Sequence, residues 1–381
     1  MRIAFLTPEY PHPLTGNSGG IGTSIKNLAT GLLQKGIVVR VLVYGQKEDE
    51  IFNDNGIIIQ QIKNIKFKGL SWFLTRKKIE RIINQLYFNK KIDLVEAPDW
   101  TGISSFIKPK FCPLIIRLNG SDTYFCHLDN RPVKWINKFH EKRALKKADA
   151  LLSVSQFTAD KTNEFFGLNK RFTIIPNAIN AGLFQSNKEK KSENNILYFG
   201  SLIRKKGLLE LPFIFNKVID SNPNAKLILI GKDVSDIISG NTSTWQMMQE
   251  LFSDKAKKNV NYLGSVSYTE VKEKIKSATV CVFPSFAEAF PVSWLEAMAM
   301  EIPIVASNVG WAKEMIDEGD SGFLSHPTDH DTFSKKIITL LNNEELCLKI
   351  GKSARRKVEK SFDIKVLAKQ NIEFYKGIIN S

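Results

Sequence analysis

Short hydrophobic runs alternate with longer amphipathic segments along most of the chain. The runs are rich in valine, isoleucine and leucine, and the segments between them carry apolar residues at helical spacing. This alternation is typical of parallel β-sheets whose strands are joined by crossover helices. A polar stretch at residues 185–195 interrupts the pattern, which then restarts. The chain is therefore predicted to form two doubly wound, Rossmann-like α/β domains that face each other across a cleft. The predicted strands are residues 3–7, 38–43, 94–97, 114–118, 150–154 and 172–175 in the first domain, and 196–199, 227–230, 260–263, 280–284 and 304–307 in the second.

The length of the chain supports two domains, because 381 residues exceed what one hydrophobic core ordinarily holds. Apolar residues make up 43% of the sequence, as in soluble globular proteins. No apolar run approaches the ~18 residues of a membrane span. The first apolar run is interrupted by Pro8 and Glu9, so it is interpreted as a β-strand and not as a signal peptide.

Cysteine and histidine residues give no sign of a metal site. The four cysteines lie far apart, without a Cys-x-x-Cys pair, and the five histidines are not spaced as metal ligands. We therefore expect reduced thiols, a cytoplasmic protein and no bound metal.

The net charge of +15 is unevenly distributed. Residues 1–183 hold 27 Lys and Arg against 15 Asp and Glu, a net charge of +12, and the remaining residues hold 27 against 24, a net charge of +3. An anionic partner is therefore expected to bind the first half of the chain.

Two acidic residues flank a helix-start signal in the segment PSFAEAFPVSWLEAMAMEIPIVA, residues 284–306. Glu288 is expected in the loop before the helix, Pro291 at its start and Glu296 in its first turn. The free N–H groups of a helix N-terminus attract anions and hydroxyl oxygens, so a polar-ligand site is one interpretation. A capped amphipathic helix without a ligand is the other, and the residues alone leave both open.

The same segment resembles the Glu-x7-Glu signature of the retaining family 4 glycosyltransferases, which have the GT-B fold, and its LEAMA and IPIVAS runs agree with that signature. In that family the first Glu contacts the donor sugar and the second holds the nucleotide ribose, which implies these roles for Glu288 and Glu296. The family commonly has Gly-Phe-Gly after the first Glu, and this chain departs from both glycines. The implied donor-binding loop comprises Ala289, Phe290, Pro291 and Val292.

A glycine-rich loop at residues 17–22 lies between the first predicted strand and a predicted helix. Glycines there allow backbone N–H groups to approach a ligand, and a helix N-terminus favours phosphate. A nicotinamide site would need an acid at the end of the second strand, and that strand ends without one. The family resemblance implies that Gly19, Gly20 and Gly22 face the donor diphosphate and the acceptor. A purely structural turn is the alternative.

A basic segment follows the first strand of the second half. Gly200 is predicted to end that strand, and Lys206 to open a helix. Cations are unfavourable at a helix N-terminus, so this placement indicates a ligand. Related enzymes have Gly-Arg-Leu and then Lys-Gly here, with the Arg and Lys clamping the pyrophosphate. Lys206 matches that Lys, Ser201 replaces the Arg, and Arg204 could supply the missing charge if the loop turned it inward.

Polar residues follow two predicted strands of the first half. Asn119 comes after the strand at 114–118, and Glu96, Asp99 and Trp100 end another strand. Ligands bind at the carboxyl ends of strands in open α/β sheets, and this mix suits the hydroxyls and the apolar face of a sugar acceptor. Asn119 stands where many family members have His, and it can hydrogen-bond an acceptor but cannot act as a base. A turn with a packed Trp is the alternative.

Asp329 and Asp331 form an Asp-x-Asp pattern, which is the metal signature of a different glycosyltransferase fold. The pattern directly precedes an amphipathic segment, so N-capping of a helix is the better interpretation. No metal is therefore expected there.

Residues 62–83 interleave basic with aromatic and aliphatic side chains. Such a face suits docking on an anionic membrane surface, with Trp72 and Phe73 as the expected apolar contacts. A partly solvated surface helix is the alternative. Nucleic-acid binding is not expected, because no nucleic-acid-binding motif accompanies the charge.

The resemblance covers nearly the whole chain and predicts a retaining, metal-independent glycosyltransferase that uses a UDP- or GDP-sugar as donor and no cofactor. Its acceptor is expected to be a glycan or a lipid-linked molecule in the synthesis of a surface polysaccharide or glycolipid. The predicted catalytic residues are Glu288, Lys206 and Asn119. A nucleotide-sugar 2-epimerase on the same fold, and a non-catalytic GT-B scaffold that binds sugar or lipid, are the alternatives left open.

The predicted domains are residues 1–183 on the acceptor side, residues 184–360 for the nucleotide sugar, and a C-terminal helix at 361–381 that returns to the first domain. The expected location is cytoplasmic, with peripheral attachment to the inner face of the cell membrane left open.

Overall fold

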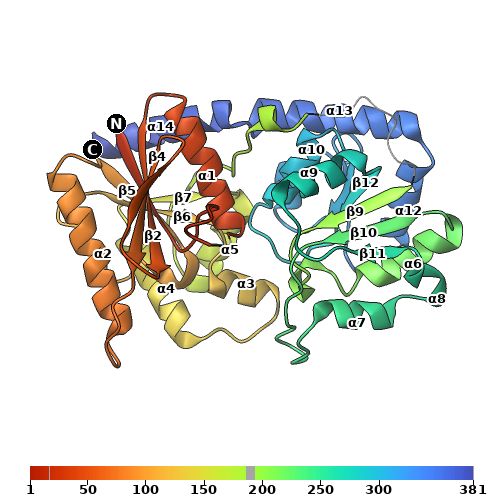
Figure 1. The fold of residues 1–381 in the computed structure, drawn as a ribbon, viewed down its shortest axis with the longest axis horizontal. Helices are drawn as coiled ribbons and strands as arrows, with labels where there is room; N and C mark the ends of the chain where they lie inside the picture. Colours follow the sequence, from red (N-terminus) through yellow and green to blue (C-terminus); the bar gives the residue numbers. More distant parts are fainter. Residues whose placement is uncertain (17, 186–193, 381) are drawn as a thin grey trace. The chain divides into compact units, whose positions relative to one another are not determined.

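The computed structural model describes residues 1–16, 18–185 and 194–380. It contains two compact α/β units (Figure 1). Unit 1 comprises Met1–Asn180 and Phe362–Ser381, and unit 2 comprises Ala181–Ser361. Most of the polar stretch that the sequence suggested as a linker lies outside the described residues. Each unit has its own predominantly parallel sheet, which confirms the predicted fold of two Rossmann-like domains.

The sheet of unit 1 has eight strands in the order β3-β4-β2-β1-β5-β6-β7-β8. β3 pairs antiparallel with β4, and the other neighbouring strands are parallel. Chain order reverses on either side of β1, so the topological switch point lies between β1 and β5. The strands are β1 (Arg2–Thr7), β2 (Val38–Gln46), β3 (Ile51–Asp54), β4 (Ile57–Lys63), β5 (Leu94–Pro98), β6 (Leu114–Leu118), β7 (Ala150–Ser153) and β8 (Thr173–Ile174).

The helices of unit 1 are α1 (Gly20–Leu33), α2 (Ser71–Phe88), the 3-10 helix η1 (Trp100–Gly102), α3 (Asp122–Leu128), α4 (Trp135–Lys147), α5 (Gln156–Phe166) and α14 (Ile364–Ile379). Alternate side chains of the sheet face opposite layers, as the pleat requires. One layer packs against α1 and α14, and the other against α2 and α4 (Figure 1). The last helix of the chain thus belongs to unit 1. It lies so close to α1 that a Cβ at Gly31 would be 3.1 Å from the Cβ of Ile364.

The sheet of unit 2 has six parallel strands in the order β11-β10-β9-β12-β13-β14. This order places the switch point between β9 and β12. The strands are β9 (Asn195–Phe199), β10 (Lys226–Ile230), β11 (Val260–Tyr262), β12 (Val280–Phe283), β13 (Ile304–Ser307) and β14 (Phe323–Ser325). The helices are η2 (Ala181–Leu183), η3 (Arg204–Lys206), α6 (Leu211–Ser221), α7 (Thr244–Leu251), α8 (Asp254–Lys257), α9 (Tyr268–Ser277), α10 (Val292–Ala299), α11 (Ala312–Met315), α12 (His330–Leu341) and α13 (Glu344–Ser361).

The structure differs from the sequence prediction in three strands. β3, β4 and β14 were not predicted, and β3 adds an antiparallel edge to a sheet that was expected to be parallel throughout. The basic-aromatic stretch at 62–83 is not one surface helix either, because β4 ends at Lys63 and α2 begins only at Ser71.

Candidate functional site

The switch point of unit 2 brings together three residues that the sequence assigned to a donor site. Gly200 directly follows β9, and Glu288 lies in the loop after β12. Lys206 places its Nζ 3.3 Å from Oε1 of Glu288. A Cβ at Gly200 would lie 3.0 Å from the Tyr198 hydroxyl and 3.4 Å from the same Nζ, so any side chain at this position would crowd the ammonium group. The result is a lysine–glutamate pair at the carboxyl edge of the sheet, where open α/β sheets bind ligands.

Backbone contacts hold the two loops of this pair together. The N–H groups of Phe286 and Ala287 donate to the carbonyl of Lys205, over 2.8 and 3.2 Å. Gly207 adopts a left-handed conformation with φ of 71°, and a Cβ there would collide with the carbonyl of Pro284. The position next to Lys206 therefore has to be glycine for the loops to meet.

Lys206 does not open a helix, which corrects the sequence prediction. It ends the 3-10 turn η3, and α6 begins only at Leu211. Lys206 is therefore not an unfavourable cation at a helix N-terminus. The indication of a ligand rests instead on the position of Lys206 beside Glu288 and the switch point.

Arg204 forms a bidentate ion pair within unit 2. Its Nε and Nη2 donate to Oδ1 and Oδ2 of Asp236, over 2.8 and 2.7 Å. These hydrogen bonds hold the pKa of Asp236 well below its ordinary value. Ser201, where related enzymes have Arg, is exposed. Any role of Arg204 toward a diphosphate would therefore compete with Asp236.

The loop from Glu288 to the start of α10 is largely buried. Ala289 and Phe290 are 5% and 3% exposed. Pro291 is the N-cap residue and α10 starts at Val292, which confirms the predicted helix start. Glu288 is therefore the polar side chain that this loop presents beside Lys206.

Glu296 lies on α10, one turn further along than the sequence suggested. It is the fifth residue of the helix, and the first turn carries no acid. The Tyr268 hydroxyl donates a 2.7 Å hydrogen bond to its Oε1. Burial raises the pKa of Glu296 to about 7, despite the opposing effects of this hydrogen bond and of the charge of Lys272. The carboxyl group thus changes its charge near neutral pH.

The glycine-rich loop of unit 1 is capped by a residue that sequence reasoning missed. Gly19 is the N-cap residue of α1, and the N–H of Gly22 donates a 2.9 Å hydrogen bond to Oε1 of Glu9. A Cβ at Gly22 would collide with Ser18 Oγ and lie 2.9 Å from the Glu9 carbonyl, so this glycine has a packing role. Gly20 borders open space, because outside its own helix turn and chain neighbours no atom of the described residues lies within 4 Å of an added Cβ. The sequence signal for this cap was Glu9, an acid that follows the first strand and precedes the glycine-rich loop.

The acceptor-side residues meet at the ends of β5 and β6. Asp99 accepts a 2.9 Å hydrogen bond from the backbone N–H of Asn119. Trp100 begins η1 and meets Phe125 edge to face. Asp99 is only 1% exposed, so its carboxyl group supports Asn119 from inside the unit.

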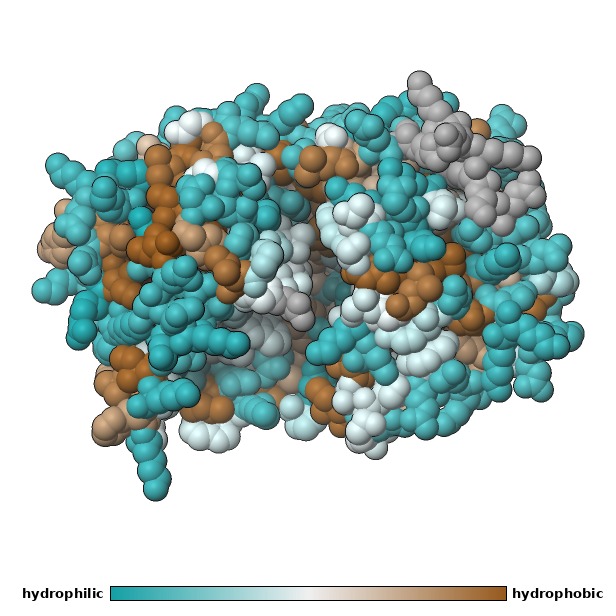
Figure 2. Space-filling model, in the orientation of Figure 1, coloured by the Kyte–Doolittle hydropathy of each residue, from teal (hydrophilic) through white to brown (hydrophobic). Residues whose placement is uncertain are grey.

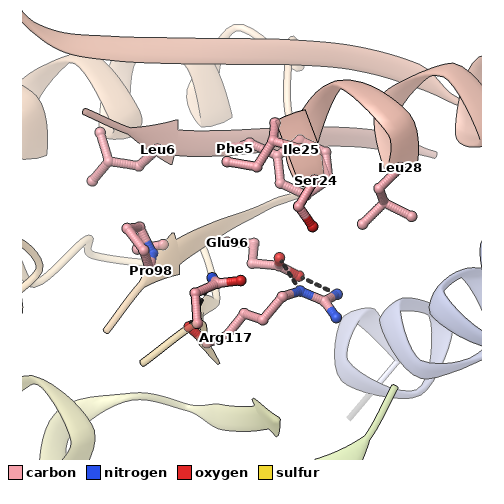
Figure 3. Close-up of a pocket in the computed structure, with 10 residues that line it drawn as sticks. Phe5, Leu6, Ser24, Ile25, Leu28, Glu96, Pro98 and Arg117 are labelled. Carbon is pink, nitrogen blue, oxygen red and sulfur yellow. Dashed lines mark hydrogen bonds and ion pairs between the residues drawn. The ribbon is translucent and has the colours of Figure 1, made fainter. Parts of the chain in front are cut away.

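Glu96 does not join this group, which corrects a second expectation. Both of its oxygens accept hydrogen bonds from Arg117, at 2.6 and 3.0 Å, and the Tyr375 hydroxyl of α14 donates to Oε2 at 2.7 Å. Figure 3 shows this pair below Ser24. The adjoining cavity of about 10 Å³ has room for roughly one water and none for a sugar. Glu96 is therefore structural and fixes α14 to the sheet.

Glu141 of α4 is a buried acid that the sequence reasoning did not single out. It accepts hydrogen bonds from the N–H groups of Thr101, Asp122 and Thr123, and so caps α3. Burial raises its pKa to about 7. Burial also raises the pKa of Asp99 to about 7, and the charge of Glu141 adds to this effect.

The contribution of Asp99 to the free energy of unfolding is expected to fall as pH rises through the acidic range. The unfolded chain releases this proton near the ordinary pKa of 3.8, and the folded chain keeps it up to about pH 7. Between these values the folded state binds more protons, so each pH unit costs it roughly 1.4 kcal/mol, about 4 kcal/mol in all. Asp99→Asn should flatten this pH dependence in urea unfolding. Asp160→Asn, at an exposed position, should not, and an unchanged slope in Asp99→Asn would contradict the assignment.

Asp329 is a helix cap, as predicted. It is the N-cap residue of α12, and its Oδ1 accepts from the N–H of Thr332 at 3.0 Å. Asp331 forms an ion pair with Lys217. Among the described residues there is no cluster of three or more His, Cys, Asp and Glu side chains that could hold a metal ion.

Two family models together match most of the chain. The model for "Glycosyltransferase Family 4" matches residues 18–183, and that for "Glycosyl transferases group 1" matches residues 181–357. An uncharacterised glycosyltransferase of Methanocaldococcus jannaschii is 25% identical over 93% of this chain and 92% of its own length. The glycogen synthase of Mycobacterium tuberculosis is 23% identical over 98% of this chain and 94% of its own length.

Solved structures share the fold over the whole chain. Sucrose-phosphate synthase from Thermosynechococcus elongatus superposes with a TM-score of 0.81 at 18% identity, covering 100% of this chain and 99% of that one. Anabaena HepE in complex with UDP-glucose gives a TM-score of 0.74 at 18% identity, covering 99% of this chain and 100% of that one. The fold is therefore that of the GT-B proteins, as the resemblance implied.

Proposed function

Because the chain belongs to the family 4 glycosyltransferases, we propose that it is a retaining, metal-independent enzyme that uses a UDP- or GDP-sugar as donor. The sugar is transferred to a glycan or a lipid-linked acceptor during synthesis of a surface polysaccharide or glycolipid. The pairing of Lys206 with Glu288 at the switch point of unit 2 is the observation that carries this proposal. Related structures, such as that of Anabaena HepE in complex with UDP-glucose, support the choice of donor class.

In this proposal the donor binds at the carboxyl edge of the unit 2 sheet. Lys206 holds the diphosphate, because its ammonium group lies at the switch point beside Gly200 and Glu288. Glu288 orients the sugar through its hydroxyls. Glu296 binds the ribose hydroxyls, and Tyr268 positions its carboxylate.

The reaction forms a bond between an acceptor oxygen and the anomeric carbon, on the face from which the diphosphate leaves. The bond between the anomeric carbon and the phosphate oxygen breaks, and the acceptor proton passes to that phosphate oxygen. Asn119 can orient the acceptor hydroxyl but cannot take its proton. The protein then contributes charge stabilisation by Lys206 and positioning by Glu288, Asn119 and Asp99.

Purified protein incubated with a panel of nucleotide sugars tests the proposal. One donor should raise the melting temperature and release nucleoside diphosphate, and the product should keep the anomeric configuration of the donor with chelator present. An epimerised nucleotide sugar formed without an acceptor would instead identify a 2-epimerase. Binding without release would identify a scaffold.

Arg204→Ala is expected to lower both stability and turnover. Removing the guanidinium leaves the Asp236 carboxylate, whose side chain is 2% exposed, without its ion-pair partner. Adding Ser201→Arg should restore part of the turnover, by supplying a cation where related enzymes have one, but not the melting temperature. If the added Ser201→Arg change restores neither turnover nor melting temperature, Arg204 acts only through its ion pair with Asp236.

A further inference from the structure

Unit 1 exposes a group of large apolar side chains on α4 and at the start of α2. Trp135 is 76% exposed, Phe139 46%, Trp72 44% and Ile136 40%. Trp135, Ile136 and Phe139 are spaced by one, three and four residues, so they share one face of α4. We refer to these four residues as the aromatic face.

Packing joins the α2 and α4 parts of the aromatic face into one surface. Phe106 lies between them, with its ring centroid 5.7 Å from that of Trp72 and 6.3 Å from that of Phe139. His140 also meets Trp72, at 5.2 Å, and Phe139, at 5.3 Å. The four side chains therefore form one patch, whose α2 and α4 parts are connected by Phe106 and His140.

The base of this patch is fixed by the backbone. A Cβ at Gly102 would collide with the backbone of His140, so α4 rests directly on η1. Arg76 of α2 is 8% exposed and donates to the carbonyls of Ile103 and Gly102. Arg76 was expected on the basic surface of the 62–83 stretch, and its burial corrects that expectation. Arg76 therefore links α2 to the η1 segment, against which α4 also packs.

The charges that accompany the aromatic face are basic. Glu141, the acid of α4, is buried and caps α3. Figure 2 shows hydrophobic beside hydrophilic side chains in the lower left part of the view, where Figure 1 labels α2 and α4. The basic residues of α4 are Lys138, Lys142, Arg143, Lys146 and Lys147, none of them buried.

We propose that the aromatic face and the basic residues of α4 form a docking surface for a bilayer with anionic headgroups. Aromatic side chains favour the membrane interface, and Lys and Arg near it are attracted to anionic lipid. A protein partner of matching shape would not require this concentration of positive charge. This docking surface rests on the proposed function, because it would bring a lipid-linked acceptor beside unit 1. Binding to vesicles can nevertheless be measured without turnover. No helix among the described residues is long and apolar enough to span a membrane, so attachment through this surface would be peripheral.

Sedimentation of the full chain with vesicles tests the surface. We expect binding to mixed phosphatidylglycerol and phosphatidylcholine vesicles, and little to phosphatidylcholine alone. Trp135→Ser with Phe139→Ser should weaken binding about thirtyfold, since two large apolar side chains no longer insert. Lys142→Gln and Lys146→Gln should each weaken it about fivefold, and high salt should do the same.

Ile51→Ser is the matched control. Ile51 is 60% exposed on β3 of the same unit, but its neighbours in sequence are Glu48, Asp49 and Glu50. These acidic neighbours should repel anionic headgroups, so the Ile51→Ser variant should bind vesicles as tightly as the unchanged chain. Equal loss in Ile51→Ser and in the aromatic double variant would overturn the proposal.

Site-specific labelling shows whether the aromatic face enters the lipid. All four native cysteines are buried, so an environment-sensitive thiol dye should react selectively with an introduced cysteine. Dye on Phe139→Cys should shift to a nonpolar emission with anionic vesicles, and dye on Ile51→Cys should not. The absence of a shift in Phe139→Cys would overturn the proposal even if the chain sedimented. A change of oligomeric state in Trp135→Ser, without loss of vesicle binding, would identify a second copy of the chain as the partner instead.

Failure of docking and failure of the proposed function give different results. Release of nucleoside diphosphate from a donor in vesicle-free solution, without vesicle binding, would support the enzyme and overturn the surface. Vesicle binding without donor turnover would support the surface and overturn the enzyme.

Discussion

Lys206→Met is expected to lower the rate of sugar transfer by about 100- to 1,000-fold and to leave the fold intact. The bond that breaks leaves negative charge on the diphosphate, and Lys206 is the cation at the switch point beside Glu288. Methionine keeps the apolar length of the side chain and removes only the charge. Transfer rates at saturating donor, with melting temperatures alongside, measure the effect.

Lys217→Met provides the matched control for this loss of charge. Lys217 lies on α6 of the same unit, is 43% exposed and forms an ion pair with Asp331. Its removal should leave the transfer rate within about twofold, because exposed ion pairs contribute little. If Lys206→Met retained a similar rate, the diphosphate would be held by other groups and the assignment would be wrong.

Glu288→Gln separates the two members of the pair. Without the carboxylate, Lys206 is no longer neutralised, so the free nucleoside diphosphate should bind at least as tightly as before. Transfer should nevertheless fall, because the donor sugar loses its orienting group. A parallel loss of nucleotide affinity would assign Glu288 to the nucleotide and not to the sugar.

The central buried strands and the edge strands β8 and β11 could be predicted from the sequence, whereas β3, β4 and β14 could not. β5 and β6 are buried at every position, and all their residues except the paired Glu96 and Arg117 are apolar. β3 alternates exposed residues with the half-buried Phe52 and the buried Asp54, beside the turn at Asn55 and Gly56, both with positive φ. That Asn-Gly turn was a usable hairpin signal. β14 has only three residues, too few to show a period.

The candidate site was predictable where residues follow strands, and unpredictable where distant charges pair. Gly200 was placed correctly at the end of a strand because the end of an apolar run marks the carboxyl edge of a sheet, and Glu288 was placed correctly in the loop before a helix because Pro291 marks the helix start. The ion pair of Arg204 joins residues 32 positions apart, and the hydrogen bond from Tyr375 to Glu96 joins residues 279 positions apart. Such contacts form only when distant segments pack together, so they cannot be predicted from the local pattern of side chains. Charges that looked available in the sequence are therefore already paired in the fold.

Glu296→Ala is expected to weaken binding of both the nucleotide sugar and the free nucleoside diphosphate by about 10- to 100-fold. The predicted contact is to the ribose, which both ligands carry, so the loss should appear equally in the two dissociation constants. Isothermal titration with the nucleoside diphosphate measures it without turnover. Equal affinities in Glu296→Ala and the unchanged chain would refute the assignment.

The pH dependence of nucleotide binding identifies the carboxylate directly. Burial raises the pKa of Glu296 to about 7, so the group is ionised above that pH and protonated below it. Ribose hydroxyls donate more strongly to the ionised form, so affinity for the nucleoside diphosphate should fall as pH drops below about 7. The fall should be smaller in Glu296→Gln, where the terminal phosphate of the nucleotide still titrates but residue 296 does not. Tyr268→Phe serves as the matched variant, because it removes the 2.7 Å hydrogen bond that lowers this pKa and keeps the carboxyl group. The midpoint should then move to higher pH, whereas an unchanged midpoint would mean that another group titrates.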